Sequence, residues 1–429
     1  MKRYFIKELY QWKAQKNRKP LILQGARQVG KTWLMLEFAK EAFKNHIYIN
    51  FESNSQLKNL FVKDFDMQRI IFEIFLATGT RPDENTLLLL DEIQEAPRGV
   101  TALKYFHEQV PQQPVIAAGS LLGIAMHQND SFPVGKVDFL TLYPLSFFEF
   151  IEAVGKSQFV EALSNKQWSA MEPFASQLED LLRQYYYVGG MPEAVKCFAD
   201  ERDTQAVRNI QLNILDAYDR DFSKHAPLNE VPRLRMIWQS VNGQLSKENK
   251  KFIYGFLKEG ARAKDFELAL EWLHDAGLVY KVHRAKKGLI PLSAYQDFSA
   301  FKLFMLDVGL LGAMGNVPPQ SIINGNAIFT DYKGAMTEQY VFQQLRLSRN
   351  NVIYYWSAEN SRGEIDFLLQ RDDKILPIEV KAEENLQSKS LRAFVEKNPE
   401  LHGIRLSMSY YREQSWMTNY PLYAVNVVF

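Results

Sequence analysis

Residues 25–32 read Gly25-Ala26-Arg27-Gln28-Val29-Gly30-Lys31-Thr32, with two glycines and a closing Lys-Thr pair at the spacing of a phosphate-binding loop. An apolar run precedes them at 20–23, and an amphipathic run follows at 33–38. That order predicts a strand, a glycine-rich turn and a helix. The glycines let backbone amides turn toward a phosphate, and the helix start adds partial positive charge. The chain is therefore predicted to bind a nucleoside triphosphate.

Two side chains of this loop have predicted roles with ATP and Mg²⁺. Lys31 is expected to reach the β- and γ-phosphates, and the Thr32 hydroxyl is expected to hold the metal ion. The residues expected to bind the nucleotide are Gly25, Ala26, Arg27, Gln28, Val29, Gly30, Lys31, Thr32, Trp33 and Ser120.

A second apolar run, Thr86-Leu87-Leu88-Leu89-Leu90, leads directly into Asp91 and Glu92. It is typical of a fully buried parallel strand that ends in two carboxylates. We expect Asp91 to hold Mg²⁺ and Glu92 to act as general base on the attacking water. Ser120 ends another buried run at 114–120, and two interpretations stay open for it. It either senses the γ-phosphate or caps the next helix.

Apolar runs alternate with helical patterns through the first part of the chain. The predicted strands are 20–24, 46–52, 86–91, 114–119 and 136–142. This alternation indicates an α/β domain over residues 1–155, with a parallel sheet and helices on both faces.

Several of these motifs together resemble the prokaryotic AAA-type ATPases that carry a C-terminal domain of unknown function. The resemblance covers nearly the whole chain, and its stretches are Gly25–Thr32, Leu88–Gln94, Ala118–Ser120, Leu142–Phe150, Tyr187–Glu193 and Lys302–Leu310. It implies an ATPase core of the ASCE type, a helical connection and a winged-helix-like segment.

One position departs from this resemblance. Many relatives have Arg in the segment 135–137, where this chain has Lys136. Lysine is a point charge and lacks the bidentate fork of arginine. The candidates for an arginine finger are therefore Arg98, Arg183 and Arg220.

Composition sets the broad class of the protein. The chain has 429 residues, of which 46% are hydrophobic and 24% charged, and its net charge of +1 favours neither nucleic acid nor a membrane as a whole-molecule partner. A single cysteine, Cys197, excludes an internal disulfide framework. With no apolar run long enough for a membrane span and no signal peptide, we expect a cytoplasmic protein.

The middle of the chain has helical periodicity. Residues 156–225 are predicted to form a helical lid or connector, and 226–315 a winged-helix-like module. Its expected helices and strands are Arg233–Val241, Asn249–Leu257, Ala263–Asp275, Leu278–His283 and Ala294–Leu306.

This module has two interpretations. In the first, Arg262, Lys264 and Glu267 lie on a recognition helix, and a basic wing with Arg284, Lys286 and Lys287 contacts DNA phosphates. In the second, the same module makes subunit or domain contacts with solvated charges.

A different chemistry appears near the C-terminus. Two alternating runs at 363–370 and 375–382 flank a polar turn, which predicts a hairpin. If Asp372 and Asp373 are the loop residues, Asp366 lies opposite Glu379 with Cβ atoms about 4.5–5.5 Å apart. A divalent cation would turn their repulsion into binding. Lys381 points to the same face as Glu379.

Asp, then Glu-x-Lys across a hairpin resembles the PD-(D/E)xK nuclease core, and Glu338 matches the acidic position on its preceding helix. The resemblance implies that Glu338, Asp366 and Glu379 hold Mg²⁺, that Lys381 assists the attacking water, and that residues 316–429 form an α/β nuclease-like domain. The alternative is an edge hairpin with a surface salt bridge to Lys381.

The sequence thus predicts an ATP-hydrolysing protein whose nucleotide state gates a DNA-directed C-terminal half, with Mg²⁺-dependent nuclease activity as one possibility. The alternative is an ATP-dependent switch of a signalling or defence module. Such a switch binds DNA, a protein partner or further copies of the chain without cleavage.

Overall fold

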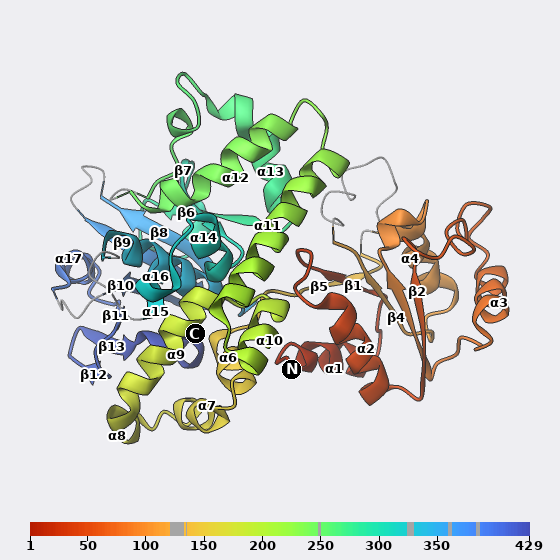
Figure 1. Cartoon of the computed structure of the whole chain (residues 1–429), viewed down its shortest axis with the longest axis horizontal. Coiled ribbons are helices and arrows are strands. Elements are labelled where there is room, and N and C mark those ends of the chain that lie inside the picture. Colours follow the sequence, from red (N-terminus) through yellow and green to blue (C-terminus); the bar gives the residue numbers. More distant parts are fainter. Residues whose placement is uncertain (121–132, 134, 248–249, 324–329, 359–362, 383–386) are drawn as a thin grey trace. The chain divides into compact units, whose positions relative to one another are not determined.

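The computed structural model describes residues 1–120, 133, 135–247, 250–323, 330–358, 363–382 and 387–429. The chain forms two compact units, shown in Figure 1. The N-terminal unit comprises Arg3–Tyr143 with Asp275–Gly277, and the C-terminal unit comprises Met1–Lys2, Pro144–His274 and Leu278–Phe429.

The N-terminal unit is built on a parallel sheet of five strands in the order β2-β3-β4-β1-β5. The strands are β1 (Leu21–Gln24), β2 (Asn45–Asn50), β3 (Thr86–Asp91), β4 (Val115–Ala118) and β5 (Asp138–Thr141). They coincide with the five predicted strands. Strand β4 lies between β1 and β3, which is the arrangement that the ASCE resemblance implies. The predicted α/β class and the P-loop fold are confirmed for this unit.

Both faces of this sheet are covered. Every residue of β3 is buried, and Leu88 and Leu90 pack with apolar residues of α3 and α4. On the other face, α2 contributes the buried Leu34 and Phe38. The helices of the unit are α1 (Ile6–Ala14), α2 (Lys31–Ala42), α3 (Met67–Thr78) and α4 (Gly99–Gln109). Continuous apolar strands are what a doubly covered parallel sheet requires.

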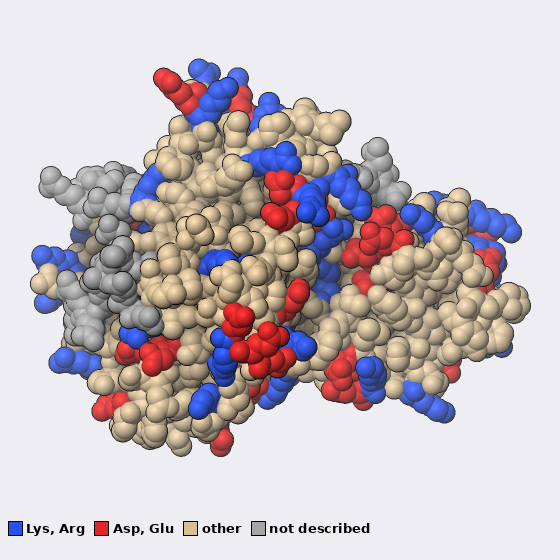
Figure 2. Space-filling view, in the orientation of Figure 1, with Lys and Arg blue, Asp and Glu red and all other residues tan. Residues whose placement is uncertain are grey.

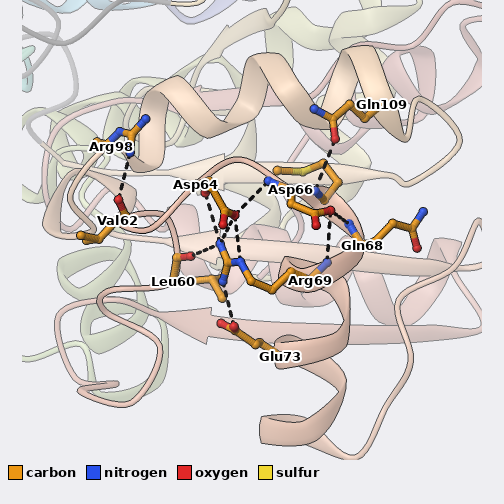
Figure 3. A network of polar contacts seen from close by, with 10 residues as sticks. Leu60, Val62, Asp64, Asp66, Gln68, Arg69, Glu73, Arg98 and Gln109 are labelled. Carbon is orange, nitrogen blue, oxygen red and sulfur yellow. Dashed lines mark hydrogen bonds and ion pairs between the residues drawn. The ribbon is translucent and has the colours of Figure 1, made fainter.

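A polar network fixes the connection between β2 and α3 (Figure 3). The Arg69 guanidinium donates to Asp64 and to Glu73, each at 2.8 Å. Arg98 donates to the Val62 carbonyl at 2.9 Å. These contacts hold a connection without regular structure against the helices that follow it.

The C-terminal unit contains a mixed sheet of eight strands in the order β12-β13-β11-β10-β9-β8-β6-β7. The strands are β6 (Val279–Ala285), β7 (Gln296–Met305), β8 (Val352–Ser357), β9 (Glu364–Arg371), β10 (Lys374–Val380), β11 (Gly403–Ser407), β12 (Arg412–Glu413) and β13 (Met417–Pro421).

Most of the remaining described residues of this unit are helical, and 156–225 has the helical character predicted for it. The helices are α6 (Phe147–Ala153), α7 (Ser157–Ser164), α8 (Trp168–Met171), α9 (Ala175–Val188), α10 (Pro192–Glu201), α11 (Thr204–His225), α12 (Val231–Leu245), α13 (Ala263–Asp275), α14 (Val308–Met314), α15 (Pro319–Ile323), α16 (Thr330–Leu345), α17 (Lys389–Lys397) and α18 (Val425–Val428). Among the described helices, none is both long enough and apolar enough to span a bilayer.

The predicted helix at 249–257 is wrong over its described part. Lys251 instead bridges to Lys302 of β7, and the Phe252 amide donates to the Phe301 carbonyl at 2.8 Å. The Phe252 ring also stacks on Phe301, with centroids 5.2 Å apart. Strand pairing and ring packing therefore override the local helical pattern, and only a short 3₁₀ turn forms at Tyr254–Phe256.

The predicted hairpin is present as β6 and β7, but it is not a free wing. Arg284 of β6 pairs in parallel with Tyr355 of β8, so the hairpin continues the C-terminal sheet. Helix α13 has the predicted bounds. The boundaries proposed at 155, 225 and 315, and the winged-helix and nuclease-like domains between them, stay predictions.

A buried polar network, here called the Asp307 network, joins four segments of the C-terminal unit. The Asp307 carboxylate accepts from the Gly190 amide at 2.6 Å, from the Leu310 amide at 3.0 Å and from Gln343 Nε2 at 3.0 Å. The Leu145 amide in turn donates to the Gly190 carbonyl at 2.7 Å. Burial raises the pKa of Asp307, although these bonds lower it.

Candidate nucleotide site and carboxylate cluster

The loop between β1 and α2 has the backbone that the sequence motif predicts. Gly25 has φ 141°, Gln28 has φ 66° and Gly30 has φ 94°. A Cβ at Gly25 would lie 2.3 Å from the Leu142 carbonyl oxygen, so only glycine fits there. The loop ends at Gly30, and α2 begins at Lys31 with its first amides directed into the loop.

Lys31 is buried inside the loop that it closes. Its ammonium donates to the carbonyls of Gly25 at 2.7 Å and Ala26 at 2.8 Å. Burial lowers the pKa of Lys31 to about 8, against the opposing charges of Glu92 and Asp91. Because these two carbonyls are neutral acceptors, an anionic phosphate oxygen would be a stronger partner for the same ammonium.

Asp91 lies at the end of β3, and one of its carboxylate oxygens accepts hydrogen bonds from two hydroxyl groups. Thr32 Oγ1 and the Tyr48 hydroxyl each donate to Asp91 Oδ2 at 2.8 Å. Asp91 is almost completely buried. A threonine hydroxyl and a carboxylate in contact are hard oxygen donors of the kind that Mg²⁺ prefers, so these residues fit the predicted metal ion.

Tyr48 is a residue of this site that sequence reasoning missed. It lies on β2, which pairs in parallel with β3 so that Asn50 is opposite Asp91. Burial raises the pKa of Tyr48 to about 12, and its hydrogen bond to Asp91 adds to the rise. In the sequence, Tyr48 is a polar ring between Ile47 and Ile49 on a predicted strand, which could have drawn attention to it. The sequence did not show which strand would lie beside this one in the sheet.

Glu92 follows Asp91 in a left-handed conformation, with φ 50°. The Ser120 hydroxyl, which follows β4, donates to Glu92 Oε1 at 3.0 Å. The structure therefore brings Ser120 to the predicted general base, while its role as a γ-phosphate sensor stays a prediction. The helix that Ser120 would cap in the second lies outside the described residues. Gln94 Nε2 also donates to the Glu92 carboxylate.

The other predicted residues of the N-terminal site lie on the same loop and helix. Ala26 and Val29 are buried, and the Trp33 side chain is 44% exposed on α2, which leaves its ring accessible to a ligand. The positive charge of Arg27 contributes to the lowered pKa of Lys31.

Two of the candidate arginine fingers, Arg98 and Arg183, have partners within their own units. Besides its bond to Val62, Arg98 lies 4.1 Å from the ring centroid of Phe65. Arg183 pairs with Asp180 at 3.0 Å, and Lys136 pairs with Glu108 at 3.1 Å. The choice among Arg98, Arg183 and Arg220 stays a prediction.

In the C-terminal unit, the predicted hairpin forms with the predicted register. Strands β9 and β10 pair from Arg371↔Lys374 to Phe367↔Ile378, and the two residue numbers of each pair sum to 745. The turn is Asp372-Asp373, with Asp372 at φ 53°. Asp366 lies just beyond the last pair, and its Oδ2 accepts from the Val380 amide at 2.7 Å.

A lysine, Lys302, lies among the carboxylates that the nuclease resemblance singled out. It comes from β7 and is fully buried. Its ammonium lies 3.4 Å from Glu338 Oε2 and 4.0 Å from Asp366 Oδ1, and it forms an ion pair with Glu364. We call Lys302, Glu338, Glu364 and Asp366 the carboxylate cluster.

The charges in and beside this cluster shift the pKa values of its members. Burial alone would lower the pKa of Lys302, but the three carboxylates raise it well above the ordinary value. The charges of Lys250 and Lys302 lower the pKa of Glu338 despite its burial. Burial and the charge of Glu338 raise the pKa of Asp366. Sequence reasoning missed Lys302, although a single lysine inside the apolar run 300–306 could have indicated a buried charge.

Glu379 and Lys381 form a separate pair. Lys381 Nζ lies 3.3 Å from Glu379 Oε1. Glu379 is buried, and its Oε2 has no hydrogen-bond partner among the described residues. Of the four residues predicted for the nuclease, the structure thus brings Glu338 and Asp366 together around Lys302, whereas Glu379 pairs with Lys381.

A search against protein families matches three segments of the chain. Residues 17–151 match an AAA domain, and residues 179–321 and 333–425 each match a domain of unknown function. Residues 17–151 are therefore similar to an AAA domain, and we call this segment the AAA domain. The match covers the loop, the strand β3 and the residues around Asp91 and Glu92, and it supports nucleotide binding and hydrolysis by the AAA domain.

No curated protein sequence matches the chain. Among solved structures, the chain is similar to the Walker-type ATPase paby2304 of Pyrococcus abyssi, with 13% identity, TM-score 0.47, and 72% of this chain and 94% of that chain covered. It is also similar to the Aeropyrum pernix ORC1 protein in complex with DNA, with 10% identity, TM-score 0.27 and coverage of 73% and 91%. The Thermotoga maritima RuvB Holliday junction branch migration motor matches with 15% identity, TM-score 0.30 and coverage of 66% and 90%.

Proposed function

We propose that the AAA domain binds ATP with Mg²⁺ and hydrolyses it. The observation that carries this proposal is the hydrogen bond from Thr32 to Asp91, because it joins the predicted phosphate loop to the predicted metal-binding strand. Glu92 and Ser120 meet beside them. The phosphate loop and the metal-binding residues of the proposed site therefore lie together at the C-terminal ends of the parallel strands.

Each residue has a distinct role in this proposal. Lys31 exchanges its two carbonyl acceptors for phosphate oxygens, and the first amides of α2 bind the same phosphates. Thr32 and Asp91 would hold Mg²⁺, which supplies charge neutralisation for the phosphates when bound. Glu92 orients the attacking water and accepts its proton, and the Ser120 hydroxyl fixes the Glu92 carboxylate.

A pair of substitutions tests this assignment. Lys31→Ala should abolish ATP binding in calorimetry, whereas Glu92→Gln should keep binding and lose turnover by about two to four orders of magnitude. Glu95→Gln is the matched control, because Glu95 is a nearby carboxylate outside the site that pairs with Lys58 at 4.0 Å. Turnover by Glu92→Gln at the parent rate would show that the general base is another group.

For the C-terminal unit, we propose a nucleotide-gated DNA contact without cleavage. The observation that favours binding over cleavage is Lys302, whose ammonium pairs with Glu338 and Asp366, two of the residues that the nuclease resemblance assigns to Mg²⁺. Exposed basic side chains at Arg262, Lys264, Lys286 and Lys287 supply phosphate contacts, while Arg284 is held by Asp297. On the face that Figure 2 shows, basic and acidic side chains are interspersed, which fits modest, salt-sensitive affinity.

DNA affinity with and without ATP tests this contact. Fluorescence anisotropy at rising salt should show affinity that depends on ATP and falls with salt. The double variant Lys286→Glu with Lys287→Glu should weaken the DNA affinity. The control double variant Lys196→Glu with Lys397→Glu makes the same change in net charge at other positions and should weaken the DNA affinity less.

Two outcomes would contradict the proposal. Mg²⁺-dependent cutting of DNA that is lost in Asp366→Ala would show that the C-terminal unit is a nuclease. ATP-dependent association with itself or another protein, without DNA affinity, would favour the signalling alternative.

A further inference from the structure

The carboxylate cluster has a resident positive charge that comes from the chain itself. Glu338 is contributed by α16, Glu364 and Asp366 by β9, and Lys302 by β7 of the same sheet. The Lys302 side chain is fully buried, while Glu338 is nearly so. A charge buried this deeply is stable only when it is paired.

The pairing is multiple and specific. Lys302 Nζ approaches one oxygen from each of the three acidic side chains. Glu338 and Glu364 lie within hydrogen-bonding reach of the ammonium, whereas Asp366 at 4.0 Å acts on it through its charge alone. The Tyr355 ring closes another side, with its centroid 5.1 Å from Nζ. Lys250 gives Glu338 a second cationic partner through its other oxygen.

A divalent cation would bind these carboxylate oxygens at shorter distances than the Lys302 ammonium does. Mg²⁺ and Mn²⁺ require oxygen ligands at about 2.0–2.2 Å, all directed at one point. In the described part of the chain, no three carboxylates of this cluster bring ligand oxygens within 4.8 Å of one another. The Lys302 ammonium already pairs with these carboxylates, and its charge would repel an incoming cation.

We propose that Lys302 is the permanent cation of the carboxylate cluster, and that the cluster holds a latent divalent-metal site which Lys302 keeps closed. Glu338 and Asp366, two of the three residues that the nuclease resemblance assigns to Mg²⁺, are therefore paired with Lys302 in place of that ion. The cluster then acts as an ion-paired support that fixes α16 to β7 and β9. Replacing Lys302 by an apolar side chain of similar length removes the competing charge and leaves three acidic side chains around the vacated volume.

Mn²⁺ binding measured by calorimetry on the full chain tests this proposal. All proteins carry Asp91→Asn, so that the AAA domain contributes no Mn²⁺ site. The protein that retains Lys302 should give no Mn²⁺ heat beyond that of the mostly exposed group Glu271, His274 and Asp275, and adding Asp366→Asn should change nothing. Adding Lys302→Met should create saturable binding, which a further Asp366→Asn should remove.

Two results would overturn the proposal. The first is saturable Mn²⁺ binding to the protein that retains Lys302, lost on Asp366→Asn. This comparison needs no Lys302 variant, so it decides the matter even if Lys302→Met does not fold. The second is a folded Lys302→Met protein, with an unchanged circular dichroism spectrum, that binds no Mn²⁺. ATP hydrolysis by the AAA domain is measured separately and does not enter either result.

Discussion

The affinity of the AAA domain for ATP should fall as the pH rises from about 7 to about 9. Burial lowers the pKa of Lys31 to about 8 in the free protein, and bound phosphate, being anionic, raises it again. Protonated Lys31 binds phosphate, and at about pH 7 roughly nine in ten free molecules carry that proton. At about pH 9 roughly one in ten does, so the affinity should drop about tenfold, or about 1.4 kcal/mol.

Calorimetry with a non-hydrolysable ATP analogue measures this drop directly. Titrations in two buffers with different ionisation enthalpies should also reveal proton uptake on binding, close to zero at the lower pH and approaching one proton at the higher. Lys31→Arg is the matched control, because the arginine pKa lies above this range and its binding, although weaker, should not follow the pH. Constant affinity of the parent protein from about pH 7 to about pH 9, with no proton uptake, would refute the reasoning.

Three further predictions concern single contacts. Gly25→Ala should abolish ATP binding, because its Cβ would lie 2.3 Å from the Leu142 carbonyl oxygen, whereas Gly79→Ala, with a φ of 71° and open space around it, should keep binding in the same titration. Tyr48→Phe removes one donor from Asp91 and should lower the free energy of unfolding by about 1 kcal/mol in chemical denaturation, more than Tyr10→Phe, whose hydroxyl meets Glu41 at the surface. Equal effects of these two changes would contradict a structural role for the Tyr48 bond. Asp307→Ala leaves three buried donors without their acceptor and should cost on the order of 3 kcal/mol, against about 1 kcal/mol for the helix cap Asp203→Ala; a smaller loss at Asp307 would show that the network relaxes.

The N-terminal unit could be predicted closely because its signals are local. The loop 25–32 has a fixed spacing, and β3 is an unbroken apolar run that ends at Asp91. The order of the strands was available only through the family resemblance. Tyr48 was missed for that reason, since its role depends on β2 lying beside β3.

The C-terminal unit shows where local patterns fail. The register of the β9–β10 hairpin followed from its two-residue turn, which is local. Lys302 is separated from Glu338 by 36 residues and from Asp366 by 64, and nothing near it in sequence reveals those partners. The segment 251–257 has a helical pattern, but its pairing with Phe301 comes from a distant strand. Contacts between segments far apart in the chain decided both cases.

The Asp307 network links pieces of chain that the family comparison treats as separate modules. Asp307 belongs to the segment 179–321, whereas Gln343 belongs to the segment 333–425, and Leu145 precedes both. Separating these two segments would take the Gln343 donor away from a buried acidic group that keeps only the donors of its own segment. A hybrid of two divergent homologues should therefore keep its full stability only when the side chain at the Gln343 position can still donate to Asp307.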